Sequence, residues 1–255
     1  MPKEEKAPER SSVEIPDVRT LTLLYTNDIQ GEAEQMAYLA TVAKQIKSSQ
    51  SYTILVDAGN WSKGTLLSDY FKGMPMVEIM NNLKYDAVAI GEGEIDFGSK
   101  NLYSLEDKAE FPLLSCNIVE SGTGIPPYFL KDKFTLIERG PFTIAIIAVS
   151  NPMKYPGAGI DAKDPFEVLP GVIEEIIKHK PDIIILLSRL GLENDKKVAN
   201  RFPQINVIVG GPDRLNLEDP VVQGDTYIVQ SGEKASFLGK LSIDIEGKIR
   251  LTSVE

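Results

Sequence analysis

Several continuous apolar runs, each followed by a polar or glycine-rich loop, constrain the fold of this chain more than any other feature. Residues 182–187 read DIIILL and residues 205–209 read INVIV. A strand that is apolar at nearly every position must be buried on both faces, as it is when helices or a second sheet cover the sheet. Helical patterns over 33–48, 76–83 and 165–178 alternate with such strands. This alternation predicts an α/β fold.

The second half of the chain adds β-rich runs that indicate a second sheet. Residues 133–139 and 142–149 flank Gly140-Pro141, which is a hairpin signal. Residues 226–230 and 237–245 close the chain with further β structure. We therefore expect two mixed sheets that face each other in a four-layer α/β/β/α sandwich.

Composition excludes several classes of function. The chain has 255 residues, of which 42% are hydrophobic, which suits one domain over 19–255 behind a flexible, Glu-, Lys-, Pro- and Ser-rich arm over 1–18. Its net charge of -10 argues against nucleic acid as a partner, because phosphate binding needs a basic face. No apolar run approaches the roughly 20 residues of a membrane span. Because Cys116 is the single cysteine, the chain cannot form an internal disulfide. No signal peptide is visible in the sequence.

Five loops follow the predicted strands and are expected to meet in space. They are TNDIQGE (26–32), DAGNWSKG (57–64), GEGEIDFG (91–98), LSRLG (187–191) and GGPDR (210–214). Sites in open α/β sheets gather beyond the carboxyl ends of the strands. The third loop carries three carboxylates on alternate residues, a composition that often holds a metal ion.

These five loops, in this order and spacing, resemble the metallophosphoesterase domain of the 5′-nucleotidase and UDP-sugar hydrolase family over about residues 20–250. The phrases NNLKYDAVAIG and FPLLSCNI add to the resemblance. It implies a pair of divalent ions that generate a hydroxide and clamp the phosphoryl oxygens of a substrate. It also implies a periplasmic or cell-surface location. The family usually has a second, C-terminal substrate-binding domain, which we do not expect within 19–255.

The family's motifs, carried over position by position, leave few of its metal ligands in place. Of seven ligand positions only Asp28 keeps the family's residue. Gln30 and Arg189 stand where the family has His. Asn60 replaces the Asp that bridges the two ions, and Glu92 replaces a metal-binding Asn.

The last loop and the third loop also lack residues that the family uses at its site. The ligand positions of the last loop are Pro212 and Arg214. Gly93 stands where the family has the His that stabilises the transition state, while Glu94 and Asp96 keep the family's residues beside it. The sequence therefore predicts no working catalytic residue, with Gly93, Glu94 and Asp96 as vestiges of the family's site.

Two arginines in place of imidazoles change the electrostatics of the loops. Arginine is effectively always protonated and repels a metal ion lodged beside it, whereas its planar fork suits carboxylates. We therefore expect Arg189 and Arg214 to form ion pairs with Asp28 and Glu92 and to fill the place of the metals. No metal ion is expected at such a site.

Three interpretations remain open for these residues. In the first, the polar groups of the cluster satisfy one another by hydrogen bonds. The protein is then an inactive binding or scaffold domain with a protein partner. In the second, the arginines bind a small anion such as phosphate, a nucleotide or sulfate. In the third, the protein is a metal-dependent 5′-nucleotidase or phosphomonoesterase that holds one Mn²⁺, Mg²⁺ or Ca²⁺. The oxygen ligands for that ion would be Asp28, Gln30, Asn60, Glu92 and Asp213.

Overall fold

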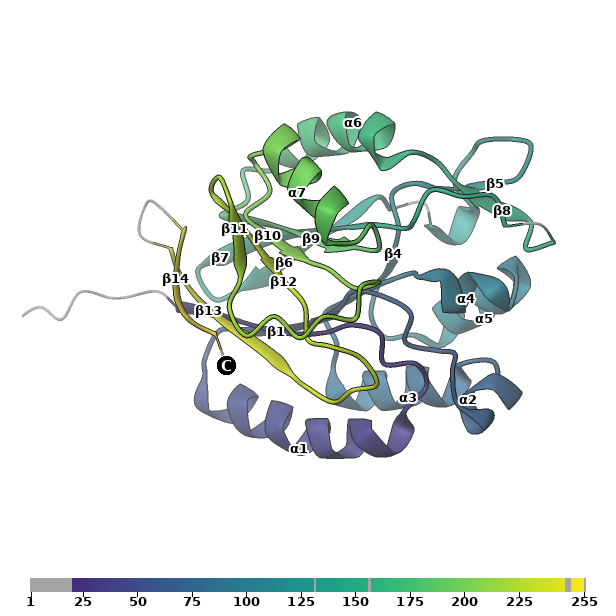
Figure 1. Cartoon of the computed structure of the whole chain (residues 1–255), viewed down its shortest axis with the longest axis horizontal. Coiled ribbons are helices and arrows are strands. Elements are labelled where there is room, and N and C mark those ends of the chain that lie inside the picture. Colours follow the sequence, from purple (N-terminus) through teal and green to yellow (C-terminus); the bar gives the residue numbers. More distant parts are fainter. Residues whose placement is uncertain (1–19, 131, 156, 246–248, 255) are drawn as a thin grey trace, which may run out of the picture.

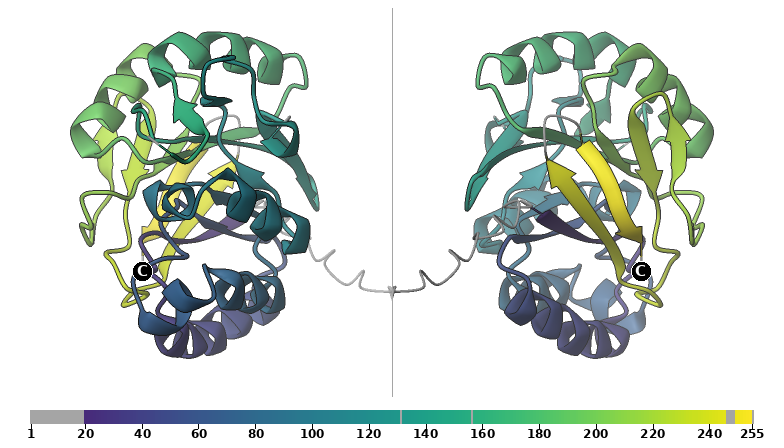
Figure 2. Two further views of the ribbon diagram at one scale, coloured as in Figure 1. Left: turned by 90° about the vertical axis from the view of Figure 1, so that its right-hand side faces the viewer. Right: turned by 90° about the vertical axis from the view of Figure 1, so that its left-hand side faces the viewer.

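The protein has the expected four-layer α/β/β/α sandwich, with two six-stranded mixed sheets face to face and helices on their outer faces (Figures 1 and 2). The computed structural model describes residues 20–130, 132–155, 157–245 and 249–254. The arm predicted over 1–18 lies outside the described residues. Among the described residues, no helix combines the length and the apolar character needed to cross a membrane.

The first sheet carries the first three of the five loops. Its strands are β1 (Thr20–Thr26), β2 (Thr53–Asp57), β3 (Ala87–Ala89), β4 (Leu113–Leu114), β13 (Gly239–Ile245) and β14 (Ile249–Val254). They lie in the order β14-β13-β1-β2-β3-β4. The pairs β1–β2, β2–β3 and β3–β4 are parallel, so the loops that follow β1, β2 and β3 leave the same edge of the sheet.

The second sheet carries the other two loops. Its strands are β6 (Phe134–Arg139), β7 (Phe142–Val149), β9 (Ile183–Ser188), β10 (Val207–Val209), β11 (Val221–Gln223) and β12 (Thr226–Val229). They lie in the order β11-β12-β10-β9-β7-β6. β6 and β7 form the predicted antiparallel hairpin, and β7, β9, β10 and β12 run parallel. A separate two-stranded sheet, which the sequence did not predict, pairs β5 (Ile118–Glu120) with β8 (Ile160–Ala162).

The helices divide between the two outer faces. They are α1 (Ala33–Ser49), α2 (Leu66–Tyr70), α3 (Met74–Leu83), α4 (Glu92–Asp96), α5 (Ser99–Lys108), η1 (Tyr128–Leu130), α6 (Pro165–Ile177) and α7 (Leu192–Arg201). In Figure 1, α1 and α3 cover the first sheet from below, and α6 and α7 cover the second from above. The short helix α4 occupies the segment that the sequence suggested as a loop.

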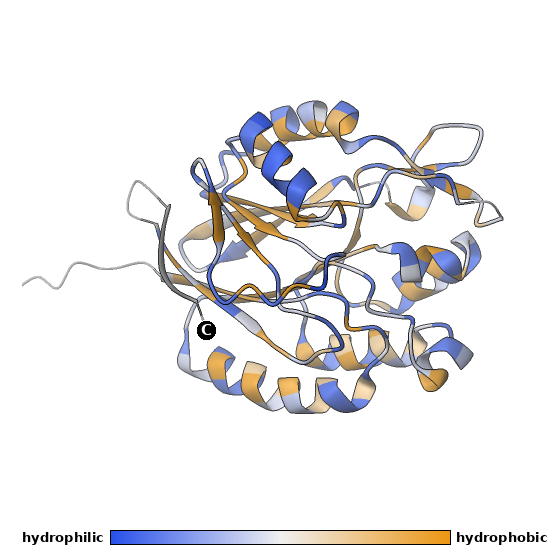
Figure 3. Ribbon diagram, viewed as in Figure 1, coloured by the Kyte–Doolittle hydropathy of each residue, from blue (hydrophilic) through white to orange (hydrophobic). Residues whose placement is uncertain are grey.

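The strand sequences explain why the layers stack in this way. Along β9, Ile183, Ile185 and Leu187 face the core between the two sheets, whereas Ile184 and Leu186 face the core beneath α6 and α7. Successive side chains of a strand point to opposite faces, so a strand buried on both faces must be apolar throughout. Figure 3 shows this apolar character along the central strands.

Candidate functional site

The buried side chain of Arg189 lies at the centre of the converging loops. It follows β9 directly and is 2% exposed. Nη1 donates to Asp28 Oδ2 at 2.9 Å and to the carbonyl of Gly59 at 3.4 Å. Nη2 donates to Asp28 Oδ1 at 3.1 Å and to Glu92 Oε2 at 3.0 Å, and Nε donates to Glu92 Oε2 at 3.2 Å. These five bonds use all five N–H donors of the guanidinium group.

Asp28 is as deeply buried as the arginine that it binds. Its side chain is 1% exposed and also accepts bonds from the amides of Asn27 at 3.1 Å and Asn60 at 2.9 Å. Burial by itself would lower the pKa of the Arg189 guanidinium, but the two carboxylates outweigh this effect and hold the pKa above its ordinary value. The expected ion pairs of Arg189 with Asp28 and Glu92 are therefore present.

Three glycines allow the backbone to approach the Arg189 side chain closely. A Cβ atom at Gly211 would lie 2.2 Å from Arg189 Nη1, and one at Gly91 would lie 2.6 Å from the backbone nitrogen of Asn60. Gly59, whose φ of +96° also favours glycine, would place a Cβ 3.0 Å from Arg189 Cδ. The loops from both sheets thus enclose the guanidinium with backbone atoms.

Glu94 joins the loop after β2 to the loop after β3. Its buried carboxylate accepts four backbone N–H groups, from Asn60 at 2.9 Å, Trp61 at 3.0 Å, Ser62 at 2.8 Å and Gly91 at 2.8 Å. Burial raises the pKa of Glu94, and the bonds from Ser62, Gly91 and Asn60 oppose that rise. The role of Glu94 is structural, because all four hydrogen-bond donors to its carboxylate are backbone N–H groups of the loops.

Gly93 and Asp96 are the other two residues of the predicted vestigial site, and both lie on α4. A Cβ at Gly93 would lie 2.5 Å from Asn60 Oδ1, so a larger side chain there requires Asn60 to move. Asp96 forms an ion pair with Lys63 at 2.6 Å, and both side chains are almost half exposed. Neither residue contacts the Arg189 guanidinium.

Arg214 does not pair with Asp28 or Glu92, so that part of the sequence expectation is wrong. Its guanidinium lies 3.2 Å from Glu233, and its side chain is 53% exposed. The reason is local: the backbone N–H of Arg214 bonds the carbonyl of Gly211 at 2.9 Å, and its φ is +55°. This turn gives the side chain an exposed position beside a different carboxylate.

Two further residues of the predicted set also have partners outside the centre. The amide of Gln30 donates to Glu233 at 3.2 Å. Asp213 accepts from the backbone N–H of Leu192, the first residue of α7, and from the amide of Gln230 at 3.4 Å. The structure therefore brings together Asp28, Asn60, Glu92 and Arg189. It places Gln30, Asp213 and Arg214 around them.

Sequence reasoning missed one buried carboxyl group behind this centre. Asp195 on α7 is fully buried, accepts the hydroxyl of Ser188 at Oδ1, and has no partner at Oδ2 among the described residues. Burial raises the pKa of Asp195 to about 7, and the charge of Asp213 adds to the rise. An acidic residue in the first turn of a helix normally indicates dipole stabilisation, so the sequence carried no signal of this burial.

The residues present do not fit a pair of divalent cations. The Arg189 guanidinium lies between Asp28 and Glu92 and occupies both oxygens of Asp28. A cation in the same place would meet a permanent positive charge. Across residues 20–130, 132–155, 157–245 and 249–254, no three His, Cys, Asp or Glu side chains gather so that they could hold a metal ion.

Comparison with known proteins finds 5′-nucleotidases among the relatives of this chain. No protein-family model matches the chain. It is 31% identical over 215 residues to the snake venom 5′-nucleotidase of Naja atra, in an alignment that covers 75% of this chain and 40% of that protein. It is 29% identical over 216 residues to the 5′-nucleotidase of Homo sapiens, with 75% and 37% covered. The chain thus spans less than half the length of these relatives.

Solved structures show the same fold at lower identity. The 5′-nucleotidase precursor of Thermus thermophilus superposes with a TM-score of 0.77 at 23% identity, covering 93% of this chain and 54% of that one. The calcineurin-like phosphoesterase YfkN of Bacillus subtilis superposes with a TM-score of 0.77 at 19% identity, covering 94% and 90%.

Proposed function

Since the chain carries a metallophosphoesterase domain of the 5′-nucleotidase type, we propose that it works as a binding or scaffold domain without phosphoesterase activity. One observation supports this proposal above all. The Arg189 guanidinium lies between Asp28 and Glu92 and directs all five of its N–H donors at protein acceptors. A charged side chain of this protein therefore occupies the place where the resemblance implies catalytic cations.

The chemistry of phosphoester hydrolysis also lacks its usual groups here. Metal-assisted hydrolysis needs an ion to activate water and a positioned group to stabilise the developing charge. The position of the stabilising His carries Gly93, and a side chain there would collide with Asn60. The single histidine, His179, makes an edge-on ring contact with Phe134 beyond the end of α6, away from the loops.

An anion-binding function for the same centre has less support. Arg189 has no N–H donor left for a phosphate or sulfate, because protein oxygens accept all five. Arg214 is half exposed but is already paired with Glu233. An anion would have to displace Asp28 or Glu92 to reach the Arg189 guanidinium, and at Arg214 it would meet the charge of Glu233.

The rival function is a metal-dependent 5′-nucleotidase or phosphomonoesterase, and the names of the relatives favour it. It requires Arg189 to leave, so that Asp28, Asn60 and Glu92 could bind one Mn²⁺, Mg²⁺ or Ca²⁺ through oxygen atoms. We also propose an extracytoplasmic location, which the venom source of one relative supports.

Metal content and activity test the two functions together. Protein purified without chelator should contain less than one equivalent of Mn, Zn, Fe, Mg or Ca by elemental mass spectrometry. It should not hydrolyse AMP, UDP-glucose or p-nitrophenyl phosphate with added Mn²⁺ above a chelator-treated blank. Stoichiometric metal together with chelator-sensitive turnover would refute the proposal.

A variant series shows whether Arg189 itself excludes the cation. Arg189→Met frees Asp28 and Glu92, so Mn²⁺ should stabilise this variant by RT ln(1 + [Mn²⁺]/Kd), which is about 2.7 kcal/mol at one hundred times Kd. Wild type and the control Arg214→Met, which keeps the buried pair, should show no such stabilisation in thermal unfolding. Equal stabilisation of wild type by Mn²⁺ would show that the guanidinium does not block the cation.

A further inference from the structure

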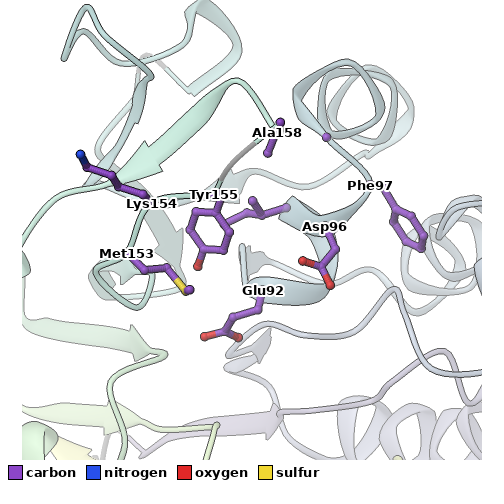
Figure 4. A pocket seen from close by; sticks show the side chains of 10 residues that line it. Glu92, Asp96, Phe97, Met153, Lys154, Tyr155 and Ala158 are labelled. Atoms are coloured by element: carbon purple, nitrogen blue, oxygen red, sulfur yellow. The ribbon is translucent and has the colours of Figure 1, made fainter.

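A cavity of about 560 Å³ opens beside Glu92, outside the ion-pair centre (Figure 4). One wall comes from α4 and includes Glu92, Ile95 and Asp96, and the other comes from the loop after β7 and includes Met153, Lys154 and Tyr155. Its volume lies in the range of small-molecule sites.

Backbone hydrogen bonds fix the wall that the loop after β7 forms. The carbonyl of Ala158 accepts the N–H of Ser99 at 3.0 Å, which ties the loop to the start of α5. The carbonyl of Met153 accepts the N–H of Ala162 at 2.9 Å, which ties the loop to β8. The cavity therefore belongs to the folded framework.

Tyr155 is a buried polar side chain that turns its hydroxyl toward this cavity. The residue is 8% exposed, and the hydroxyl has no hydrogen-bond partner among the described residues. In Figure 4 the phenol oxygen points toward the space between Met153 and Glu92. The nearby charges of Glu92 and Asp96 add to the effect of burial in raising the pKa of Tyr155, so the hydroxyl keeps its proton. An unpartnered buried donor of this kind is rare in native proteins and calls for an explanation.

The two carboxylates of the cavity need hydrogen-bond donors but no further positive charge. Glu92 binds Arg189 through Oε2, and Asp96 binds Lys63 through Oδ2. Glu92 Oε1 and Asp96 Oδ1 have no partner among the described residues. A ligand that complements this wall must donate to two carboxylate oxygens and accept from one phenol. Hydroxyl groups do both, because each carries one donor and two lone pairs.

We propose that this cavity binds a neutral polyhydroxyl compound of the monosaccharide class. One hydroxyl donates to Glu92 Oε1 and accepts from Tyr155, and a neighbouring hydroxyl donates to Asp96 Oδ1. The apolar face of the sugar packs on the exposed side chain of Met153. Phosphorylated sugars bind more weakly, because a phosphate brings acceptor oxygens to a wall whose unpaired atoms are carboxylate oxygens, and the Lys154 side chain points away from them (Figure 4).

Met153 provides the entry to the Tyr155 hydroxyl. The phenol oxygen is closed to solvent, while the Met153 side chain is 47% exposed and lies beside it (Figure 4). A methionine side chain is unbranched and has three rotatable bonds, so it can move aside for a ligand. This site does not depend on the absence of a metal from the loops, and metal analysis therefore cannot decide it.

Sugar titration by ligand-observed NMR tests the proposal on the full chain. Methyl α-D-glucopyranoside and methyl β-D-ribofuranoside serve as probes, with glucose 6-phosphate as the anionic comparison and putrescine as the cationic one. At least one glycoside should bind saturably with a millimolar dissociation constant, and glucose 6-phosphate should bind at least about tenfold more weakly.

Variants locate the binding. Tyr155→Phe keeps the ring in the core and removes only the hydroxyl, so it should weaken glycoside binding about tenfold. Tyr70→Phe, a change at a tyrosine that is 78% exposed on α2, should have no effect. The proposal is overturned if neither glycoside binds saturably, if Tyr155→Phe binds as wild type does, or if putrescine or glucose 6-phosphate binds more tightly than both glycosides.

Discussion

Replacing Arg189 by methionine should destabilise the protein strongly, because it leaves Asp28 buried without its cation. Removal of one partner from a buried ion pair typically costs about 3–5 kcal/mol. Asp28 keeps the amide bonds from Asn27 and Asn60 and loses the two bonds from the guanidinium. Methionine retains most of the apolar stem, so the loss reports mainly on the charge and its hydrogen bonds.

Thermal and urea unfolding of Arg189→Met measure this loss. For a domain of this size, about 2–4 °C per kcal/mol converts the expected cost into a fall in Tm of about 6–20 °C. Adding Asp28→Asn to Arg189→Met should recover part of the stability, since the double variant buries no unpaired charge.

The matched control is Arg214→Met, which removes a half-exposed arginine paired with the partly exposed Glu233. Exposed ion pairs contribute little, so this variant should stay within about 0.5 kcal/mol of wild type. If Arg189→Met costs no more than Arg214→Met, the buried pair does not stabilise the loops and the reasoning fails.

Three further substitutions probe the surroundings of this pair. Because burial raises the pKa of Asp195 to about 7, the folded protein holds a proton there that the unfolded chain releases above about pH 4. Stability should therefore fall by up to about 1.4 kcal/mol per pH unit between about pH 4 and pH 7, and urea midpoints of Asp195→Asn should show a flatter pH profile. Gly211→Ala puts a methyl 2.2 Å from a guanidinium nitrogen and should cost about 1–3 kcal/mol by urea unfolding, whereas Gly171→Ala, which meets no atom within 4 Å on α6, should be neutral or stabilising. Glu94→Ala leaves four backbone N–H groups without an acceptor and should cost more than about 3 kcal/mol, against less than about 1 kcal/mol for the exposed Asp96→Ala; equal losses would contradict the role of Glu94.

The layers and the meeting of the loops follow from the sequence because burial on both faces leaves a clear pattern. Runs such as residues 182–187 can be satisfied only inside a covered sheet, and parallel strands bring their carboxyl ends to one edge. The ion pairs of Arg189 follow from the family resemblance, which places this arginine at a ligand position beside Asp28 and Glu92. These predictions depend on the strand pattern and on the order of the loops, and not on local backbone geometry.

Where local backbone geometry decides the outcome, less could be predicted. Arg189 and Arg214 are the same residue type at the ends of neighbouring strands, yet a left-handed φ at Arg214 gives it an exposed partner. The segment of α4 looked like a loop because of Gly93, and Glu94 supports its N-terminus through the N–H of Gly91. Nothing in a loop without periodicity indicated that the Tyr155 hydroxyl would be buried without a partner.

The hydrogen bonds of Glu94 affect how this protein can bind a ligand. Its carboxylate crosslinks two loops that are about thirty residues apart in the chain, using only groups of the protein itself. The conformational entropy of these loops is therefore lost when the chain folds and not when a ligand arrives. A partner that docks at this edge meets a surface whose backbone is already set, so recognition here approaches rigid-body association and the loops after β2 and β3 do not close as a lid.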